Sequence, residues 1–388
     1  MCNCTLDSRQ ENGVRMKKLK LEIKSDSGSA VYFADIAVDR MEPSQTLPAK
    51  FARMLEKLLI PKKIKGKTVG IKMHFGGSIG YTTISPVFVR ILVKALKNAG
   101  AKSVKAMDGN PMDGVPRGYT REVLECDVVS CFGTDGKYLY KEKIGFKTLD
   151  EALFGGEAVD CDFFIDLAHI KGHGDCGFGG ALKNIGMGVV TGETRGKIHK
   201  LEGGIIYSKD KCIFCLKCVK ECKNKAVRTD KTNRQVSIFF HNCTYCQHCV
   251  MICPSKALVM EDRRFEDFSE GMALVTSKFL KRFTQENILF INFLTNITVY
   301  CDCWGMSTAS LVPDIGILAS DDIVAIETAS LDMIKTEDLL PKGLPTGRKL
   351  LEGSHLFEKI HAKDPYLMIR CLKRLHGGSE EYRITEIK

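Results

Sequence analysis

Eight of the seventeen cysteines in this chain follow one spacing twice, and this repeat limits what the chain can fold into more than any other feature. Each copy has three cysteines at intervals of three residues and a fourth cysteine four residues later. Three thiolates on one tight loop can cap one face of a cubane, whereas the fourth points towards a second cluster. The spacing therefore predicts two [4Fe-4S] clusters. Their ligands are Cys212, Cys215, Cys218 and Cys253 for one cluster, and Cys243, Cys246, Cys249 and Cys222 for the other.

Disulfides and zinc are the alternative uses of such cysteines. Disulfide frameworks are typical of short secreted chains, and zinc sites usually pair two CxxC units across a longer gap. The segment from Tyr207 to Asp262 resembles the bacterial two-cluster ferredoxin module in its cysteine spacing, in Pro254 and in the 31-residue offset between repeats. Lys223 stands where the first repeat of that module usually has proline, which does not bind iron. The resemblance implies a small α+β ferredoxin-like domain over residues 207–263.

The length of 388 residues, with 44% hydrophobic and 27% charged residues, is that of a soluble globular protein larger than one average domain. No apolar run reaches the roughly 18 residues of a membrane span, and the first residues lack the apolar segment of a secretory signal. We therefore predict a cytoplasmic protein with no membrane partner. Iron-sulfur clusters of this kind are sensitive to oxygen, so an anaerobic host is expected.

The formal charge of +10 comes from dispersed lysines and arginines, which argues against nucleic acid as a partner. Within residues 207–262, ten Lys or Arg face five Asp or Glu. A basic rim beside a redox centre would steer an acidic electron carrier such as ferredoxin or flavodoxin. The alternative is a solvated surface that offsets the negative charge of the clusters.

The rest of the sequence alternates apolar strands and amphipathic helices, which predicts an α/β domain with a mostly parallel sheet and flanking helices. Ser85 and Pro86 open a helix that Gly100 closes, between two of these strands. The cluster segment lies between predicted strands, so we expect one discontinuous α/β domain over residues 16–206 and 264–388. We expect residues 1–15 to be a disordered extension, and a strand-like sequence pattern begins at Met16. The buried strands are expected at 68–75, 103–108, 163–168, 288–293 and 315–319.

Polar side chains gather where predicted strands end, and in open α/β sheets ligands bind at the carboxyl ends of strands. Lys72 and His74 share one strand face before Gly76 and Gly77. If the next stretch is extended, His169, Lys171 and His173 also share a face. Five glycines between His169 and Leu182 make regular structure costly there but suit a loop that wraps an anion. The alternatives are a solvated strand face and a flexible connector.

Two further segments carry reactive side chains. Cys301 and Cys303 flank Asp302 and precede the chain's one tryptophan, Trp304; they could bind a metal, attack a substrate or be buried. The segment 192–199, rich in glycine and cations and ending in His199, suits an anionic ligand or an exposed hinge. Histidines at these places are metal ligands or proton shuttles. The sequence contains neither a Walker loop nor a dinucleotide fingerprint.

The α/β halves around an inserted two-cluster module resemble the domain-of-unknown-function family DUF362, whose members are often labelled uncharacterised iron-sulfur centre proteins. The resemblance covers most of residues 65–335. It implies a redox-associated α/β protein and names no substrate. The motifs that carry it are Lys72-x-His74, Lys171-Gly172-His173 running to Leu182-Lys183-Asn184-x-Gly186, and residues 314–320 with Asp322 and Ile326.

The leading hypothesis is an iron-sulfur oxidoreductase that passes single electrons through two clusters to a substrate or second cofactor at the glycine-rich loop. In this hypothesis the histidines move protons, the lysines, including Lys183, hold an anionic substrate such as an unsaturated carboxylate, and Cys301 or Cys303 is a nucleophile or ligand. Two alternatives stay open. One is an electron carrier or redox sensor without a substrate, and the other is metal-dependent catalysis at the histidines with structural clusters. The candidate catalytic residues are His173, His169, Lys171, His74, Lys72 and Cys303.

Overall fold

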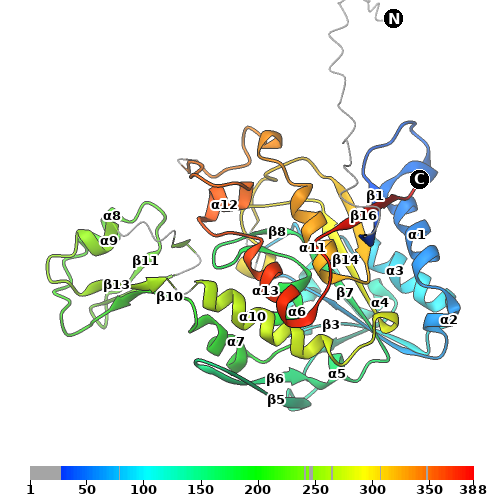
Figure 1. Ribbon diagram of the computed structural model, residues 1–388, viewed down its shortest axis with the longest axis horizontal. Helices are drawn as coiled ribbons and strands as arrows, with labels where there is room; N and C mark the ends of the chain where they lie inside the picture. The colour runs from blue at the N-terminus through cyan, green and yellow to red at the C-terminus, as the bar shows by residue number, and fades with distance from the viewer. Residues whose placement is uncertain are drawn as a thin grey trace, which may run out of the picture.

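The computed structural model describes residues 28–77, 79–239, 242–243, 248–263, 265–305, 307–346 and 348–388. Residues 1–15, the strand-like pattern at Met16 and Cys246, for which the sequence makes predictions, lie outside the described residues. The chain forms a large α/β part, called the body below, and a small lobe that stands out from one side of it (Figure 1).

The body is built on a sheet of eight strands in the order β16-β1-β15-β14-β7-β2-β3-β4. Among these strands, β15 runs antiparallel to both of its neighbours, and the other neighbouring strands are parallel. This confirms the prediction of an α/β fold with a mostly parallel sheet. The strands are β1 (Ser29–Asp35), β2 (Thr68–Met73), β3 (Ser103–Asp108), β4 (Asp127–Ser130), β7 (Phe163–His169), β14 (Ile288–Leu294), β15 (Gly316–Ser320) and β16 (Tyr382–Glu386).

Helices cover both faces of the sheet, and each face has its own apolar layer. On one face lie α1 (Leu47–Leu58) and α3 (Pro86–Asn98), whose apolar stripes pack on alternate residues of the central strands. The predicted boundaries of α3 are confirmed: the Ser85 side chain accepts a hydrogen bond from the N–H of Val87, and Gly100 takes φ +87°. The other face carries α6 (Ala181–Gly188), α10 (Phe265–Leu280), α11 (Ile323–Asp332) and α13 (Leu367–His376).

Shorter elements complete the body. A β5–β6 hairpin lies below the sheet in Figure 1, and a second hairpin, β8–β9, follows β7 directly. The 3₁₀ helix η5 (Asp302–Trp304) comes after β14. No helix among the described residues is long and apolar enough to cross a membrane. The bounds are β5 (Leu139–Phe146), β6 (Leu149–Gly155), β8 (Lys171–His173), β9 (Gly177–Gly179), α2 (Pro61–Ile64), α4 (Arg121–Leu124), α5 (Gly156–Val159), α7 (Gly192–His199) and α12 (Leu356–His361).

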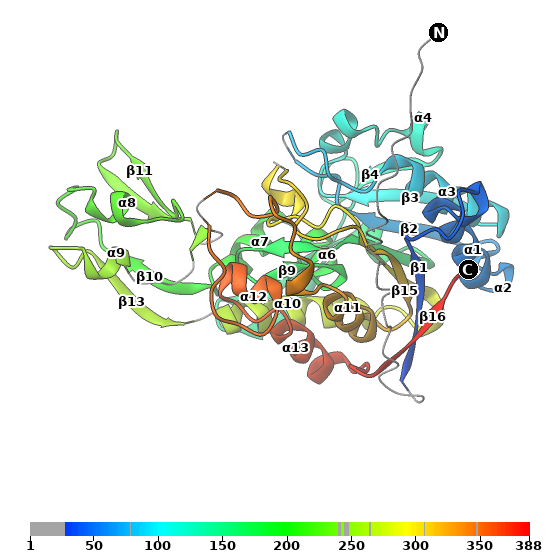
Figure 2. The same cartoon turned by 90° about the horizontal axis from the view of Figure 1, so that it is seen from above.

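The small lobe comprises residues Gly203–Arg263 and has its own apolar core. Its first and last strands, β10 (Gly203–Tyr207) and β13 (Leu258–Arg263), pair antiparallel, so the chain enters and leaves the lobe along one ribbon (Figure 2). Between them lie the helices α8 (Lys217–Glu221) and α9 (His248–Met251) and the hairpin of β11 (Val227–Asp230) with β12 (Gln235–Ile238). Five of the predicted cluster cysteines contribute to or pack against this core: Cys218, Cys243, Cys249, Cys222 and Cys253.

Candidate functional site

Three adjacent parallel strands bring the predicted body residues to one edge of the sheet. In the order β14-β7-β2, Lys72 is the second-last residue of β2 and His169 is the last residue of β7. Cys301 follows β14 after a short loop, and the β8–β9 hairpin with Lys171 and His173 follows β7. The carboxyl ends of these strands therefore form one polar centre, as expected for an open α/β sheet.

The glycine-rich stretch forms regular structure, contrary to the expectation that its glycines make this costly. Residues Lys171–His173 pair with Gly177–Gly179, and the stretch is buried. The glycines serve close packing: a Cβ on Gly172 would lie 2.3 Å from the carbonyl oxygen of Val299, and one on Gly180 would lie 2.4 Å from Glu327 Oε1. Gly177 takes φ +83° at the turn. The hairpin is therefore a fitted part of the site, and the connector alternative is wrong.

The carboxylate of Asp302, in η5, contacts both His169 and Lys171. Lys171 Nζ donates to Asp302 Oδ1 at 2.5 Å and to Thr82 Oγ1 at 2.8 Å, and His169 Nδ1 lies 3.0 Å from Asp302 Oδ2. Burial alone would raise the pKa of Asp302, but the charges of His169 and Lys171 outweigh it and hold this pKa below its ordinary value. Burial lowers the pKa of both His169 and Lys171. The group is a buried, charge-matched cluster.

A second cluster surrounds Lys72. Its ammonium lies 3.0 Å from Asp108 Oδ1 and donates to Asn184 Oδ1 at 2.8 Å. His74 Nδ1 lies 3.4 Å from Asp108 Oδ2, and the charge of His74 also helps to lower the pKa of Asp302. Lys72 is 1% exposed, so the solvated strand face considered for it is wrong. Lys72 and Lys171 are both buried and both already bind carboxylates.

Cys301 and Cys303 are joined in a disulfide beside His173 and Lys183. Lys183 Nζ lies 3.7 Å from the sulfur of Cys301 and 3.8 Å from that of Cys303. His173 Nε2 lies 3.7 Å from the sulfur of Cys303. Cys301 is buried whereas Cys303 is exposed. The pair therefore presents one sulfur to the outside, with an amine and an imidazole next to it.

The other nitrogen of His173, Nδ1, lies 3.4 Å from Cys176 Sγ and 4.0 Å from Asp175 Oδ2, and it also meets a backbone donor. Nδ1 accepts a hydrogen bond from the backbone N–H of Asp175 at 3.2 Å. A neutral imidazole that accepts at Nδ1 carries its hydrogen on Nε2. His173 thus directs an N–H towards the sulfur of Cys303.

A buried acidic group lies at the turn of the hairpin, where Asp175 is close to His173. His199 Nδ1 lies 2.5 Å from Glu202 Oε1 and 3.8 Å from Asp175 Oδ2. Burial and the neighbouring Glu202 raise the pKa of Asp175, and burial raises the pKa of Glu202 to about 8. Burial lowers the pKa of His199. A cation, Lys363, is close enough for its charge to act on both carboxyl groups.

Donor atoms that could hold a metal ion converge in two places of the described body, one of which contains the Cys301–Cys303 disulfide and offers thiolates only when this bond is reduced. One group is His173 with Cys301 and Cys303, and the other is Asp175 with His199 and Glu202. Within each group the ligand atoms lie within 4.8 Å of one another. Nitrogen and sulfur donors suit zinc or other soft transition metals, and a histidine with two carboxylates suits zinc, manganese or iron.

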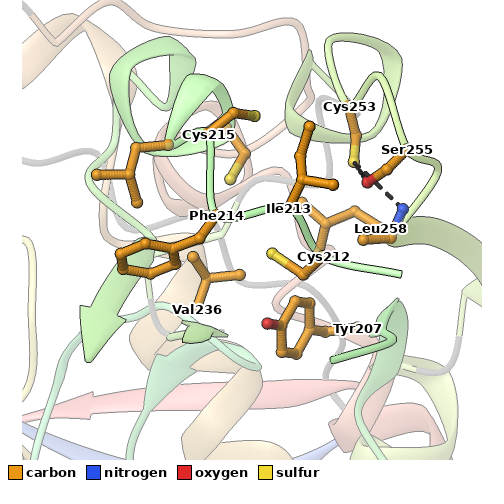
Figure 3. Close-up of a pocket in the computed structure, with 12 residues that line it drawn as sticks. Tyr207, Cys212, Ile213, Phe214, Cys215, Val236, Cys253, Ser255 and Leu258 are labelled. Atoms are coloured by element: carbon orange, nitrogen blue, oxygen red, sulfur yellow. Dashed lines mark hydrogen bonds between the residues drawn. The ribbon is translucent and has the colours of Figure 1, made fainter. Parts of the chain in front are cut away.

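In the small lobe, cysteines from both sequence repeats line one pocket. Cys212, Cys215 and Cys218 of the first repeat share it with Cys253 of the second (Figure 3). The pKa of Cys218 is raised by burial and then by the nearby Cys253, Cys215 and Cys212, in that order. These four cysteines are the set that the spacing assigned to one cluster.

The fourth cysteines of the two repeats occupy matching environments. The N–H of Ala226 donates to the sulfur of Cys222 at 3.1 Å, and the N–H of Ala257 donates to the sulfur of Cys253 at 3.2 Å. In both repeats the donor lies four residues after the cysteine. Such N–H···S bonds favour thiolates, and hydrogen bonds of this kind lower the pKa of Cys253 although its burial acts in the opposite direction.

Lys363 connects the small lobe to the body. It is 2% exposed, and its ammonium donates to the backbone carbonyl of Cys243 at 2.9 Å. The same lysine acts electrostatically on Asp175, and its own carbonyl lies 3.0 Å from where a Cβ on Gly177 would be. One residue thus contacts the second cysteine repeat and the turn of the β8–β9 hairpin.

Sequence reasoning named most of these residues but missed three with central contacts. Asp302 was quoted only as the residue between two cysteines, although an acid in that position after a strand is a usable signal. Glu202 follows the cationic segment that ends in His199, and its role depends on a fold that places it next to Asp175. Lys363 has no local signal, because its partner Cys243 is 120 positions away.

Comparisons with known proteins give one family and several distant structures, of which two are representative. The family model described as "Domain of unknown function (DUF362)" matches residues 69–332. No curated protein matches the chain. The structure of the lactate racemase apoprotein from Thermoanaerobacterium thermosaccharolyticum is 12% identical, with a TM-score of 0.32 over 71% of this chain and 52% of that one. A crystal structure of a Thermotoga maritima protein is 11% identical, with a TM-score of 0.33 over 66% of this chain and 52% of that one. The chain thus spans about half the length of each, and similarity this low has no bearing on function.

Proposed function

The chain belongs to the DUF362 family, and on that premise we propose that it is an iron-sulfur oxidoreductase. Single electrons enter at the small lobe and are used at the polar centre formed by the β8–β9 hairpin and η5. Because the family description leaves the activity open, the proposal depends on the site itself. The observation that carries it is the pocket of the small lobe, where cysteines of two separate repeats converge.

The described donors of the small lobe support the proposal with one complete set of four cysteines. Four sulfurs from both repeats around one pocket match the exchange of the fourth ligand between clusters. Backbone N–H groups placed on Cys222 and Cys253 stabilise thiolates, which are the ligands that iron requires. Of the second set, Cys246 lies outside the described residues. When bound, the clusters would supply one-electron transfer.

The contact between lobe and body supports the use of these electrons in the body. Lys363 donates to the carbonyl of Cys243, and its own carbonyl packs on Gly177 in the β8–β9 hairpin, which carries His173. A redox lobe used only as a carrier would not require a buried lysine that joins it to a reactive centre. An acidic carrier such as ferredoxin or flavodoxin remains the expected donor, because the lobe segment carries an excess of basic residues.

In this proposal, fewer of the body residues act directly on a substrate than their sequence pattern suggested. Asp302 and Asp108 already neutralise Lys171 and Lys72, so these two lysines position the site. His169 positions Asp302 in the same way. Lys183 is the amine that faces the reactive sulfurs and would attract an anionic substrate. His173 holds a proton towards Cys303, and His74 lies at the rim beside Asp108.

Anaerobic iron and sulfide analysis with EPR of the dithionite-reduced protein tests the proposal. The native chain should contain about eight irons, and a Cys253→Ala variant about four, because one cluster loses a ligand supplied by the other repeat. Cys126→Ala, which removes a buried cysteine of the body, is the matched control and should keep the native iron content. Iron far below eight per native chain after reconstitution would refute the proposal.

A second candidate function is metal-dependent catalysis in the body, favoured by the convergence of Asp175, His199 and Glu202. It predicts a metal other than cluster iron that is lost in a His199→Ala variant. The same elemental analysis decides between the two: absence of a further metal from the native chain would eliminate this second candidate.

A further inference from the structure

We propose that Cys301 and Cys303 are a redox-active pair that reduces a disulfide of another molecule. This inference names the substrate class of the proposed function and rests on it, because that function supplies the electrons. The two sulfurs form a disulfide at the carboxyl end of the sheet, and the turn of the hairpin beside them contacts the segment that binds the second cysteine repeat.

The two sulfurs differ in exposure in the way that thiol–disulfide exchange requires. Cys303 is exposed and can meet the disulfide of an incoming molecule, whereas Cys301 is only 6% exposed. Exchange proceeds through a mixed disulfide on the accessible sulfur, and a second thiol next to it then resolves that intermediate. Cys303 is therefore the attacking sulfur and Cys301 the resolving one.

The neighbours of the pair stabilise its reduced form. Lys183 places its amine within 3.8 Å of both sulfurs. Burial lowers the pKa of this amine, and in its charged form it favours thiolates at this distance. His173 directs its Nε2–H at the sulfur of Cys303. The charge that appears on sulfur when the disulfide opens thus meets an amine and an N–H donor already in place.

The same hydrogen bond of His173 argues against a metal between His173 and the two cysteines. A histidine that binds a metal through Nε2 carries its hydrogen on Nδ1 and donates it to an acceptor. Here Nδ1 faces the backbone N–H of Asp175, which is itself a donor. Metal binding through Nε2 would set two hydrogens against each other, whereas an Nε2–H towards sulfur satisfies both nitrogens.

A segment with exposed apolar side chains is hydrogen-bonded to the chain just after Cys303. The N–H of Ile79 donates to the carbonyl of Gly305, two residues after Cys303, and the N–H of Tyr81 donates to Ser307 Oγ. Ile79 is 81% exposed and Tyr81 75% exposed. Exposed apolar groups on a segment bonded just after Cys303 suit a disulfide with an apolar flank, and the amine of Lys183 suits an anionic group on the same molecule.

The reaction balances as follows. Two electrons from two equivalents of a one-electron donor, with two protons, convert the Cys301–Cys303 disulfide into two thiols. The Cys303 thiolate then attacks one sulfur of the substrate disulfide, and the other substrate sulfur leaves and takes up a proton. Cys301 next attacks the sulfur of Cys303, which releases the second substrate thiol and restores the internal disulfide. The net change is one substrate disulfide, two electrons and two protons to two thiols.

The first test measures the oxidation state of the pair in the full chain. Cluster-loaded protein is mixed anaerobically with dithionite-reduced methyl viologen, quenched in acid and alkylated, and the peptide with Cys301 and Cys303 is weighed by mass spectrometry. The native peptide should gain two alkyl groups only after the donor is added. In Cys253→Ala this gain should fall to the rate of direct reduction by the donor, while dithiothreitol should still open the disulfide.

The second test traps the intermediate with bis(2-hydroxyethyl) disulfide, an uncharged probe. Cys301→Ser should accumulate a mixed disulfide on Cys303, because no resolving thiol remains, whereas Cys303→Ser should accumulate none on Cys301. Cys126→Ala should turn over the probe like the native protein. Elemental analysis separates the two ideas. A chain with about eight irons whose disulfide stays closed, or whose adduct forms on Cys301, overturns this inference alone, and a chain without iron overturns the proposed function as well.

Discussion

The buried group around Asp302 makes the sharpest prediction, because one carboxylate neutralises a lysine that has almost no access to water. Lys171 is 1% exposed and lies 2.5 Å from Asp302. At an effective dielectric constant of about 20, two unit charges at this distance attract by about 7 kcal/mol, and the cost of desolvating both charges offsets part of that. Asp302→Asn leaves the lysine charge buried and unmatched. We expect a loss of about 3–5 kcal/mol in the free energy of unfolding at pH 7.

Urea unfolding followed by the fluorescence of the single tryptophan, Trp304, measures this loss next to the substitution. The matched control is Asp302→Asn combined with Lys171→Met, which removes the buried charge and keeps the volume. The double variant should recover most of the loss, because replacing a buried ion pair with apolar groups is often neutral. An Asn variant within about 0.5 kcal/mol of native, or a double variant no more stable than the single one, would show that the pair does not act as a buried ion pair.

The pH dependence gives an independent check with a definite sign. The pKa of Asp302 is held below its ordinary value of 3.8 because the charges of His169 and Lys171 outweigh the effect of burial. A lowered pKa in the folded state contributes stability above the unfolded pKa and loses it as the pH falls. The advantage of native protein over Asp302→Asn should therefore be constant from about pH 5 upwards and shrink below about pH 4.

Three further predictions follow from single contacts. Gly172→Ala should destabilise the β8–β9 hairpin because its Cβ would lie 2.3 Å from a carbonyl oxygen. Gly196→Ala, whose Cβ would have nothing within 4 Å, should instead stabilise α7 by about 0.5–1 kcal/mol. The melting temperatures of the two variants test both expectations. Burial raises the pKa of Glu327 to about 7 from 4.5, so native stability should fall by up to about 3 kcal/mol as pH rises through that window, and Glu327→Gln should flatten the fall in urea titrations. Lys363→Met should increase hydrogen exchange around Cys243 and leave exchange in the central strands unchanged. Equal exchange around Cys243 in the native protein and in this variant would show that Lys363 does not hold the lobe.

The sequence predicts the sheet well because its strands are buried and locally patterned. The strands β2, β3, β7, β14 and β15 lie where their apolar runs predict them. The β8–β9 hairpin was not predicted, because glycine content was read as local freedom. In the fold, the missing side chain of Gly172 lets the hairpin pack against the carbonyl of Val299.

In the candidate site too, local sequence patterns predict some contacts, whereas other contacts depend on residues far apart in the sequence. The ligand rule of bacterial two-cluster ferredoxins grouped Cys253 with the first repeat, and these four cysteines line one pocket. Periodicity predicted that His169 and Lys171 share a face, and both reach Asp302. The contact of Lys363 with Cys243 depends on a fold that joins residues 120 positions apart, and no local pattern encodes it.

That same contact has a consequence for the order in which the protein matures. The ribosome completes the second cysteine repeat long before it adds Lys363, and β14, which pairs with β7, also follows the lobe. The backbone carbonyl of Cys243 therefore has no contact with Lys363 while the lobe is being synthesised. Once the carboxyl-terminal segment is in place, Lys363 donates to that carbonyl. If the lobe binds clusters as proposed, its Cys243 side is more accessible to iron and sulfide before this contact forms than after it.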